Sequence, residues 1–354
     1  MKVIRYFGVA ATSIARWDGF HWHPLGSGIG GVPYSVYALA FGPDGSLYAG
    51  GAFTIAGGVA TNRIARWDGA QWHPLGSGMA GGGMGYWGVR ALVFGPDGSL
   101  YAGGAFTTAG GFAASYIARW DGTGWHHLSL GSGISGAVLA LAVGPDDSLY
   151  AGGEFTTAGG VVANGIARWD GAQWHPLGSG MGGVYYRVIY ALAFSPDGSL
   201  YAGGSFTTAG GIAAKDIARW DGAQWHPLGT GMSVYDVGVR ALVFGPDGSL
   251  YAGGEFTTAG GVAANHIARW DGAQWHPLGT GMWMTGDYPF VNALTFGPDG
   301  SLYAGGHFTT AGGIAANDIA RWDGAQWHPL GSGMSVYDIG VRALVFGPDG
   351  SLYT

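Results

Sequence analysis

The side chains that could do chemistry recur once per repeat along this chain, and histidine is the first of them. Imidazole is a common metal ligand, but a metal site needs three or four ligands around one ion. Histidines in equivalent positions of successive repeats would lie too far apart to share an ion, so we expect a scaffold role and no metal. One histidine follows a tryptophan in each repeat: His23, His73, His126, His175, His226, His276 and His328.

Carboxylates and thiols also form no recognisable catalytic set. The chain has no cysteine, which excludes disulfides and thiolate chemistry. Each Gly-Pro-Asp-Gly segment offers one carboxylate, fewer oxygen ligands than calcium takes. No Ser/His/Asp set stands out, so we predict no enzyme activity and no cofactor. His21, His127, His266 and His307 are scattered and show no ligand spacing. The acids to test in an enzyme would be Asp236, Asp287, Asp338, Glu154 and Glu255.

Aromatic side chains gather in the segments that differ most between repeats. Amphipathic rings interspersed with Gly and Asp suit a surface that binds a glycan or a protein. The same rings could instead cap the ends of the repeats and shield the core. Trp87 and Trp283 favour binding, because no other repeat has a tryptophan there. The candidate binding residues are Tyr34, Tyr86, Trp87, Tyr185, Tyr186, Tyr235, Trp283, Tyr288, Phe290 and Tyr337.

Two arginines join this candidate surface because of their place before an Ala-Leu pair. Counting back from a two-residue Asp-Gly turn sets Arg240 against Glu255 as a cross-strand ion pair. The same count sets Arg90 against Ala105, which cannot pair with it. Arg90 and Arg342 are therefore expected to reach elsewhere, and we hypothesise an anion-sensitive site at the centre of the assembled repeats.

A repeat of about 50 residues positions all of these side chains. Self-similarity at this period is typical of propellers, solenoids and arrays. Seven such units can close into one ring, and 73 glycines in 354 residues favour turns over helices. The segment Ile-Ala-Arg-Trp-Asp-Gly or a close copy begins at Ile14, Ile64, Ile117, Ile166, Ile217, Ile267 and Ile319.

Each repeat predicts four short antiparallel strands. In one clear copy they are expected at 239–244, 249–254, 266–270 and 274–278, with Asp-Gly pairs favouring tight hairpins between them. The chain starts with strands three and four of a repeat and ends with strands one and two. Pairing of the C-terminal strands with the N-terminal strands would close the ring and remove its free edges.

We therefore predict that residues 1–354 form a single all-β domain, a seven-bladed β-propeller with four antiparallel strands per blade. The variable aromatic segments would share one face. The repeated tryptophans would pack blade against blade, and the arginine of each Ile-Ala-Arg-Trp segment would pair with the aspartate two residues later. The expected blades span 1–29 with 341–354, 36–79, 89–133, 137–181, 188–232, 239–282 and 290–334.

The repeat resembles the kelch repeat. Gly253-Gly254 at the end of a strand, Trp270 in the next and Trp275 in the last carry the resemblance, which recurs along essentially the whole chain. The blade shared between the termini lacks the Gly-Gly pair. The resemblance implies a propeller and says little about activity. Galactose oxidase, a kelch-like enzyme, uses a Cys-crosslinked Tyr with copper, which this cysteine-free chain cannot form. The Trp-Asp pair is similar to that of WD40 repeats, but their Gly-His signature is absent.

Composition restricts the partner. A net charge of −7 without a basic stripe disfavours nucleic acid, and no apolar run approaches the roughly 18 residues of a membrane span. The opening residues lack the features of a signal peptide and begin inside a repeat, so we expect a mature form or part of a longer protein.

We predict a non-catalytic module, extracellular or at the cell surface, that binds a glycan or protein partner as a monomeric propeller or within a larger assembly. The alternatives are a structural subunit of a surface layer, filament or larger complex, and an enzyme acting at the mouth of a central channel.

Overall fold

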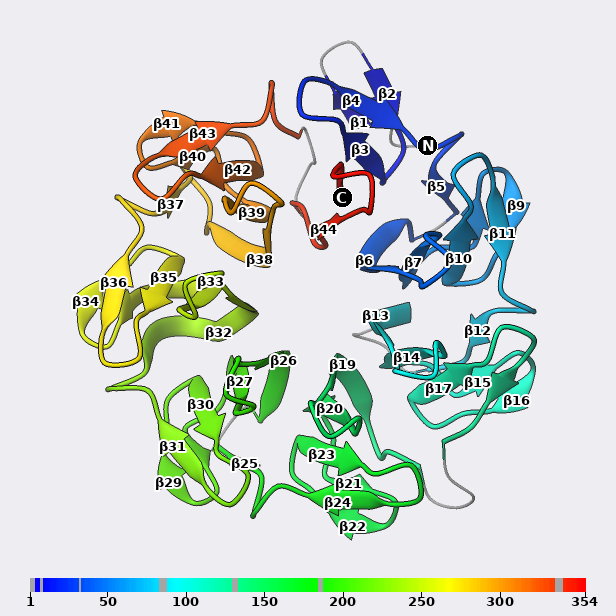
Figure 1. The fold of residues 1–354 in the computed structure, drawn as a ribbon, viewed down its shortest axis with the longest axis horizontal. Coiled ribbons are helices and arrows are strands. Elements are labelled where there is room, and N and C mark those ends of the chain that lie inside the picture. The colour runs from blue at the N-terminus through cyan, green and yellow to red at the C-terminus, as the bar shows by residue number, and fades with distance from the viewer. Residues whose placement is uncertain are drawn as a thin grey trace. The chain divides into compact units, whose positions relative to one another are not determined.

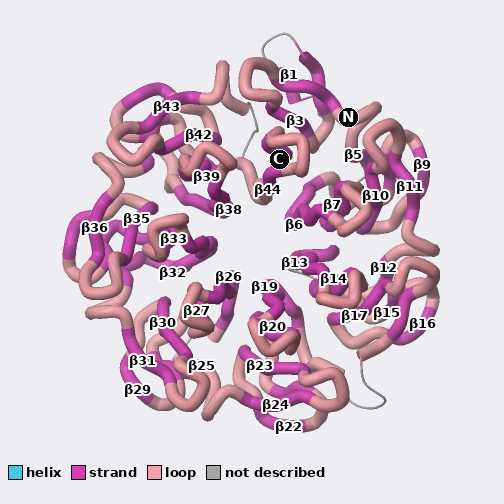
Figure 2. Tube along the Cα trace, in the orientation of Figure 1, coloured by secondary structure: helices cyan, strands magenta, loops and turns pink. Residues whose placement is uncertain are grey.

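The computed structural model describes residues 4–6, 9–31, 33–82, 88–128, 133–183, 187–334 and 340–354, with the backbone alone at 4–6, 9–10 and 234–237. Strands and loops make up this part of the chain, as the tube in Figure 2 shows. No helix within these ranges is long and apolar enough to cross a bilayer. The chain divides into two compact units, residues 1–177 with 347–354 and residues 178–346.

The first unit contains three complete four-stranded antiparallel sheets, here called blades 2 to 4 (Figure 1). In each blade the strands follow chain order, so every neighbour is reached by a hairpin or short loop. Blade 2 is β6 (Ser35–Phe41), β7 (Leu47–Ala52), β10 (Ile64–Trp67) and β11 (Trp72–Pro74). Blade 3 is β13 (Gly88–Phe94), β14 (Leu100–Ala105), β17 (Ile117–Trp120) and β18 (Trp125–His126). Blade 4 is β19 (Ala137–Val143), β20 (Leu149–Glu154), β23 (Ile166–Trp169) and β24 (Trp174–Pro176).

Blade 1 joins the two ends of the chain. The C-terminal strand β45 (Leu352–Tyr353) pairs antiparallel with β3 (Ala15–Trp17), which pairs with β4 (Trp22–Pro24). The main chains of Ala15 and Thr354 exchange two hydrogen bonds, of 2.9 and 3.0 Å. A hairpin of β1 (Ile4–Tyr6) and β2 (Val9–Ala11) precedes this sheet. The predicted sharing of one blade between the termini is therefore confirmed.

The second unit repeats the same sheet three times, as blades 5 to 7. Together with blades 1 to 4 these sheets give an all-β propeller of seven blades among the described residues. Blade 5 is β26 (Val188–Phe194), β27 (Leu200–Ser205), β30 (Ile217–Trp220) and β31 (Trp225–Pro227). Blade 6 is β32 (Met232–Phe244), β33 (Leu250–Ala259), β35 (Ile267–Trp270) and β36 (Trp275–Pro277). Blade 7 is β38 (Phe290–Phe296), β39 (Leu302–His307), β42 (Ile319–Trp322) and β43 (Trp327–Pro329), and β44 (Val345–Phe346) follows it.

One end of each blade, called the loop end, carries the connection from the preceding blade and a small hairpin between its second and third strands. In most blades the connection pairs with the hairpin, as Met79 does with Ala109. This pairing ties consecutive blades together and fixes the variable segments on a frame of main-chain hydrogen bonds. The strands involved are β5 (Ile29–Gly30), β8 (Ile55–Ala56), β9 (Val59–Ala60), β12 (Met79–Ala80), β15 (Thr108–Ala109), β16 (Phe112–Ala113), β21 (Thr157–Ala158), β22 (Val161–Val162), β25 (Met181–Gly182), β28 (Thr208–Ala209), β29 (Ile212–Ala213), β34 (Val262–Ala263), β37 (Met282–Trp283), β40 (Thr310–Ala311) and β41 (Ile314–Ala315).

The opposite end, called the turn end, carries the Gly-Pro-Asp-Gly-Ser and Trp-Asp-Gly turns. In blade 6 the Gly245 N–H donates to the Ser249 carbonyl at 2.9 Å, and Phe244 pairs with Leu250. Residues 245–249 therefore form the loop, and the predicted two-residue Asp-Gly turn is wrong. The Asp247 carboxylate accepts the Ser249 N–H and hydroxyl at 3.0 and 2.8 Å, which stabilises this longer loop.

A β-bulge shifts the register again near the start of the first strand. In blade 6 the bulge falls at Arg240, whose guanidinium forms the predicted ion pair with Glu255. In blade 3 it falls at Arg90, so Ala105 pairs with Gly88 and the predicted Arg90–Ala105 register is wrong. A bulged residue stands outside the regular alternation of the strand, which lets its long side chain reach a neighbouring blade.

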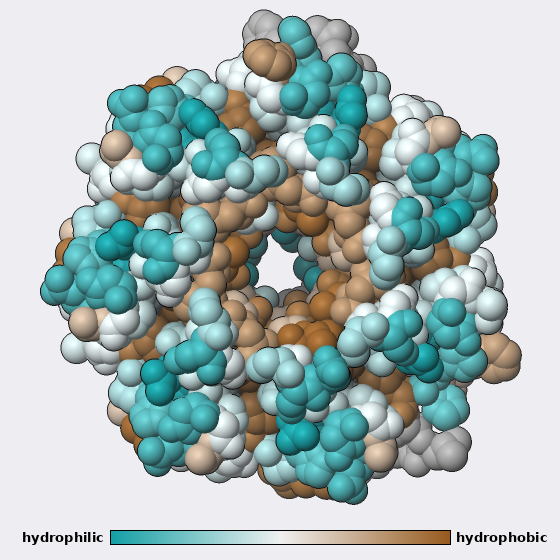
Figure 3. All heavy atoms as spheres, in the orientation of Figure 1, coloured by the Kyte–Doolittle hydropathy of each residue, from teal (hydrophilic) through white to brown (hydrophobic). Residues whose placement is uncertain are grey.

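Two ion pairs cover the turn end of each blade except blade 5, which has one among the described residues, and their partners differ from the prediction. The arginine of Ile-Ala-Arg-Trp pairs with the aspartate of the Gly-Pro-Asp turn, as Arg66 does with Asp44 at 3.2 Å. The aspartate of Trp-Asp-Gly instead pairs with the histidine that follows the outer tryptophan, as Asp68 does with His73 at 2.6 Å. The expected Arg–Asp pair within Ile-Ala-Arg-Trp-Asp is therefore wrong, because both partners are taken. Figure 3 shows hydrophilic side chains gathered over each blade.

The core lies between consecutive blades. Between blades 5 and 6, Ile217, Leu228 and Met232 pack against Phe256 and Trp275. The indole N–H groups of four outer tryptophans, Trp72, Trp125, Trp275 and Trp327, donate to main-chain carbonyls, and that of Trp275 reaches the Leu228 carbonyl at 3.3 Å. Packing of the two tryptophan rings against each other recurs in all seven blades, and in several of them a buried hydrogen bond adds to it.

Candidate functional site

The loop ends of blades 6 and 7 bring three of the predicted aromatic residues into one connection, which runs from β36 to β38. Trp283 lies on β37, where its main chain pairs with Thr310 of β40. Its carbonyl also accepts the Thr309 N–H at 3.0 Å. The backbone is thus fixed while the side chain is 61% exposed. A large ring held in solvent on a rigid backbone is a ready contact for a partner.

Tyr288 is the second exposed ring of this connection, with 79% of its surface accessible. Asp287 organises the backbone before it, because one carboxylate oxygen accepts the Tyr288 N–H at 2.8 Å. The other oxygen lies 3.4 Å from Nε2 of His307. The Tyr288 N–H, and then the His307 ring, hold the pKa of Asp287 below its usual range. Asp287 is therefore an ionised hydrogen-bond acceptor at the surface, bonded to the Tyr288 main chain and in contact with His307 of blade 7.

His307 and Phe290 form the floor beneath these groups. They are register partners on β39 and β38, and their rings lie 5.4 Å apart. His307 is 7% exposed, and its Nδ1 lies 3.6 Å from a carboxylate oxygen of the buried Asp318. Asp318 also accepts the Phe308 N–H at 3.1 Å. The imidazole thus stands between a buried carboxylate and an exposed one.

Arg240 extends the cluster from blade 6 to blade 7. Its guanidinium pairs with Glu255 on its own blade and lies 4.8 Å from the centre of the Phe290 ring on the next. It also donates to the side-chain oxygen of Asn292 at 3.1 Å, and the Asn292 amide donates to the Val341 carbonyl at 3.2 Å. These contacts neutralise the arginine and hold the floor in place.

The arrangement is suited to recognition. One connection carries two exposed rings and an ionised acceptor, and the acceptor contacts a floor whose polar groups are paired with one another. Such a surface offers apolar faces for stacking and a few fixed hydrogen-bonding groups for orientation. Within the described residues, no three His, Asp or Glu side chains come together as metal ligands would.

The other predicted site residues are separate from this cluster or lie outside the description. Tyr34 is partly exposed in the first unit. Arg90 lies 3.8 Å over the ring of Tyr37 on the neighbouring blade, also in the first unit. Arg342 is partly buried directly after Val341. Tyr86, Trp87, Tyr185, Tyr186 and Tyr337 lie outside the described residues, as does the side chain of Tyr235.

Sequence reasoning missed His307, Asn292 and Asp318. In the sequence His307 is one of the scattered histidines, because it matches no ligand spacing. Its signal was positional: it follows a Gly-Gly pair where other repeats have alanine, serine or glutamate. Asp318 likewise occupies a variable position before Ile-Ala-Arg-Trp. A residue that differs from its equivalents in the other repeats indicates a candidate site residue better than its residue type alone does.

Comparisons with known proteins agree with the architecture. The model of the family described as "Domain of unknown function (DUF5122) beta-propeller" matches residues 42–67, 95–122, 144–169, 245–270 and 297–322. These matches begin at the turn between the first two strands and end at or just after the third. No curated protein sequence matches the chain.

Solved propellers resemble the chain at low sequence identity. A streptogramin B lyase structure has a TM-score of 0.55 at 12% identity, with 90% of this chain and 93% of that chain covered. The extracellular domain of the hybrid two-component system BT3049 from B. thetaiotaomicron has a TM-score of 0.56 at 11% identity, covering 90% of this chain and 39% of that one. The WD40 β-propeller domain of Doa1 has a TM-score of 0.55 at 11% identity, covering 96% and 95%. Similarity at this level shows the fold, and the chain is a β-propeller.

Proposed function

We propose that this propeller is a non-catalytic recognition module that binds a glycan through the loop ends of blades 6 and 7. The observation that carries the proposal is the exposure of Trp283 and Tyr288 on one connection that also holds the ionised Asp287. Sugar rings present flat apolar faces to aromatic side chains and hydroxyl groups to carboxylates. Arg240 and Glu255 neutralise each other, so a neutral ligand suits this surface better than a charged one.

Two features of the comparisons are compatible with this role. One similar structure is the extracellular domain of a two-component system, which supports a place outside the cell for this propeller. Another is a lyase, so the fold also hosts enzymes. The recognition role rests on the surface of blades 6 and 7 rather than on either neighbour, and the kelch-like classification of the repeat belongs to the same proposal.

The test is a glycan array followed by calorimetric titration of the best ligand. Trp283→Ala and Tyr288→Ala should each weaken binding by about 1–3 kcal/mol, the scale of a stacking contact. Phe20→Ala is the matched control. Phe20 is also a highly exposed ring, but it lies in a Trp-Asp-Gly turn where most repeats have alanine.

Unchanged binding in both loop variants would contradict the proposed surface. A blank array from a stable, monodisperse protein would contradict a glycan ligand and direct the search to protein partners. Turnover of a ligand that Asp287→Asn abolishes would instead establish an enzyme.

A further inference from the structure

Blade 5 has a turn that differs from that of every other blade. The Gly-Pro-Asp segment begins with Ser195 here, where the other blades have Gly42, Gly95, Gly144, Gly245, Gly297 and Gly347. The Ser195 hydroxyl donates to the Asp197 carboxylate and lies 3.0 Å from the Ser199 carbonyl. It also accepts the Ser199 N–H at 3.1 Å. The added hydroxyl thus holds the turn aspartate within its own loop.

This change in the turn alters the pairing of Arg219, the arginine of the Ile-Ala-Arg-Trp segment in blade 5. The six equivalent arginines each pair with the turn aspartate of their blade, at 2.8 to 3.5 Å. Arg219 forms no close ion pair with any carboxylate of the described residues, because Asp197 is hydrogen-bonded to Ser195 instead. Ser195 and, at longer range, Arg219 both lower the pKa of Asp197. A guanidinium that lacks the aspartate partner of the other blades can pair with another anion, and a planar carboxylate fits its geometry.

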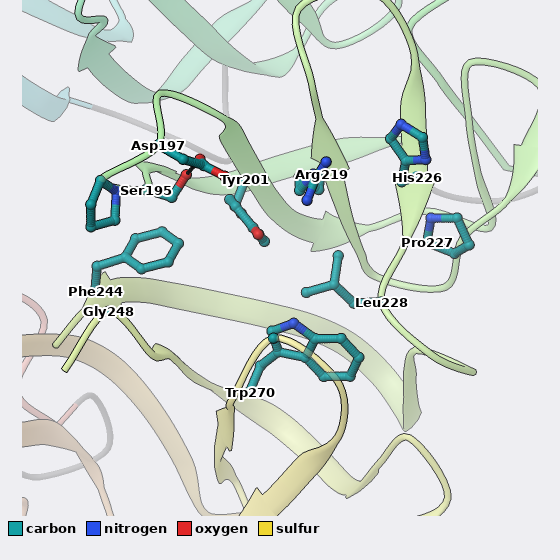
Figure 4. Close-up of a pocket in the computed structure, with 12 residues that line it drawn as sticks. Ser195, Asp197, Tyr201, Arg219, His226, Pro227, Leu228, Phe244, Gly248 and Trp270 are labelled. Carbon is teal, nitrogen blue, oxygen red and sulfur yellow. Dashed lines mark hydrogen bonds between the residues drawn. The ribbon is translucent and has the colours of Figure 1, made fainter.

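This arginine lines a pocket between blades 5 and 6 at the turn end. The pocket has a volume of about 490 Å³, within the range of about 300–1,000 Å³ usual for small-molecule sites. Arg219, Tyr201 and Asp197 line one side, and Phe244, Leu228 and Trp270 line the other. Figure 4 shows Arg219 between Tyr201 and His226, with Leu228 and Trp270 facing them. A charged group therefore faces an apolar wall.

We propose that this pocket binds a small organic carboxylate with an apolar or aromatic body. Arg219 pairs with the carboxylate, and the Tyr201 hydroxyl is placed to donate a hydrogen bond to it. Phe244, Leu228 and Trp270 cover the body of the ligand. The nearby Asp197 repels a second negative charge, so the site favours a monoanion over phosphate or a dicarboxylate. The site is on the opposite end of the blades from Trp283, and it stands whether or not the loop end binds a glycan.

The experiment is a calorimetric titration of the full chain with benzoate, beside inorganic phosphate and benzylamine. Benzoate should bind, and the other two should bind about tenfold more weakly or not at all. Ser195→Gly restores the turn of the other blades and frees Asp197 to pair with Arg219. This variant should stay folded and lose about tenfold or more in benzoate affinity. Arg219→Gln should do the same by removing the charge.

Arg66→Gln is the matched control, because Arg66 occupies the same position in blade 2 but pairs with Asp44. Its benzoate affinity should equal that of the unaltered chain. Equal affinity in Ser195→Gly and the unaltered chain would overturn the proposal, as would an absence of benzoate binding. Tighter binding of phosphate than of benzoate would overturn the ligand class.

Discussion

The residue before each Ile-Ala-Arg-Trp segment combines a fixed backbone with a variable side chain. Its φ is positive in all seven blades, and in blades 2 to 7 its main-chain N–H and carbonyl are both hydrogen-bonded. In blade 5 the Asp216 N–H donates to the Phe206 carbonyl, and the Asp216 carbonyl accepts the Gly204 N–H, each at 3.0 Å. The backbone contacts do not depend on the side chain, so this position tolerates many residues. The occupants are Ser13, Arg63, Tyr116, Gly165, Asp216, His266 and Asp318.

Asp216 makes the stability of the protein depend on pH in a specific direction. Burial raises the pKa of its carboxyl from 3.8 to about 6. Between these values the folded chain binds more protons than the unfolded chain, so the free energy of unfolding falls as pH rises. Asp216→Asn keeps an oxygen acceptor for the Phe206 N–H and suits a positive φ. We expect the variant to be more stable than the unaltered chain by about 1–3 kcal/mol at pH 7, and equal to it near pH 4.

Urea denaturation at several pH values measures this difference. His266 provides an internal control, because burial lowers the pKa of its imidazole from 6.5 to about 4. Stability from His266 is complete above pH 6.5 and is lost as pH falls toward 4, which is the opposite sign. That acid-side loss should remain in Asp216→Asn. A stability difference between variant and unaltered chain that stays constant across pH would disprove the assignment to Asp216.

At the residue scale, the sequence predicted the exposed part of the candidate site better than its floor. Trp283 and Tyr288 stand out because they interrupt a repeat at a loop, and exposure follows from that position. The contact of His307 with Phe290 depends on a register set by a long turn and a bulge, and neither is encoded by residue type. Asp287 was foreseen as an acid to test, but its pairing with His307 required the folded loop.

At the element scale, the strands follow directly from alternating runs between turns, while the hairpin register does not. The Asp-Gly pair predicts a turn but not its length, because the Asp247 carboxylate closes a five-residue loop by accepting the Ser249 N–H and hydroxyl. The Gly-Gly pair of each second strand has a steric cause that becomes visible only in the sheet. A Cβ on Gly253 would press on the Val291 side chain, and a Cβ on Gly254 would overlap the Gly238 carbonyl.

Gly254→Ala should therefore destabilise the protein by about 2–4 kcal/mol, measured as the free energy of unfolding in urea. The backbone of Gly254 has no positive φ, so the cost comes from the overlap with the Gly238 carbonyl and not from the dihedral angle. Gly124→Ala is the control, because a Cβ there meets only the His126 ring at 3.9 Å and the position is glutamine in most other repeats. Gly124→Ala should change stability by less than about 0.5 kcal/mol. Equal effects of the two variants would refute the steric reading.

At the scale of the whole molecule, the phase of the repeat predicted how the ends of the chain meet. A chain that begins with strands three and four and ends with strands one and two leaves two partial sheets. Joining them covers a sheet edge that would otherwise pair with another chain. The pairing of β45 with β3 fulfils this expectation without any help from residue-level motifs. The strand of the repeat at which the chain begins and ends thus predicts topology, although it does not predict function.

Removal of residues 347–354 tests how much blade 1 depends on this strand. The deletion takes away the buried side chains of Leu352 and Tyr353 and both hydrogen bonds between Ala15 and Thr354. We expect the free energy of unfolding to fall by at least about 3 kcal/mol, because a buried leucine alone contributes about 2–5 kcal/mol. The Ala15 amide should lose its protection from hydrogen exchange, and the bared edge of β3 should promote association at high concentration. Asp349→Asn removes the exposed ion pair with Arg16 and disturbs the hydrogen bond from the Tyr353 hydroxyl, but its amide oxygen can still accept the Ser351 N–H, so the change should cost about 1 kcal/mol or less. If the truncated chain keeps both its stability and the protection of Ala15, β45 contributes nothing to blade 1 and the sheet stands on β3 and β4 alone.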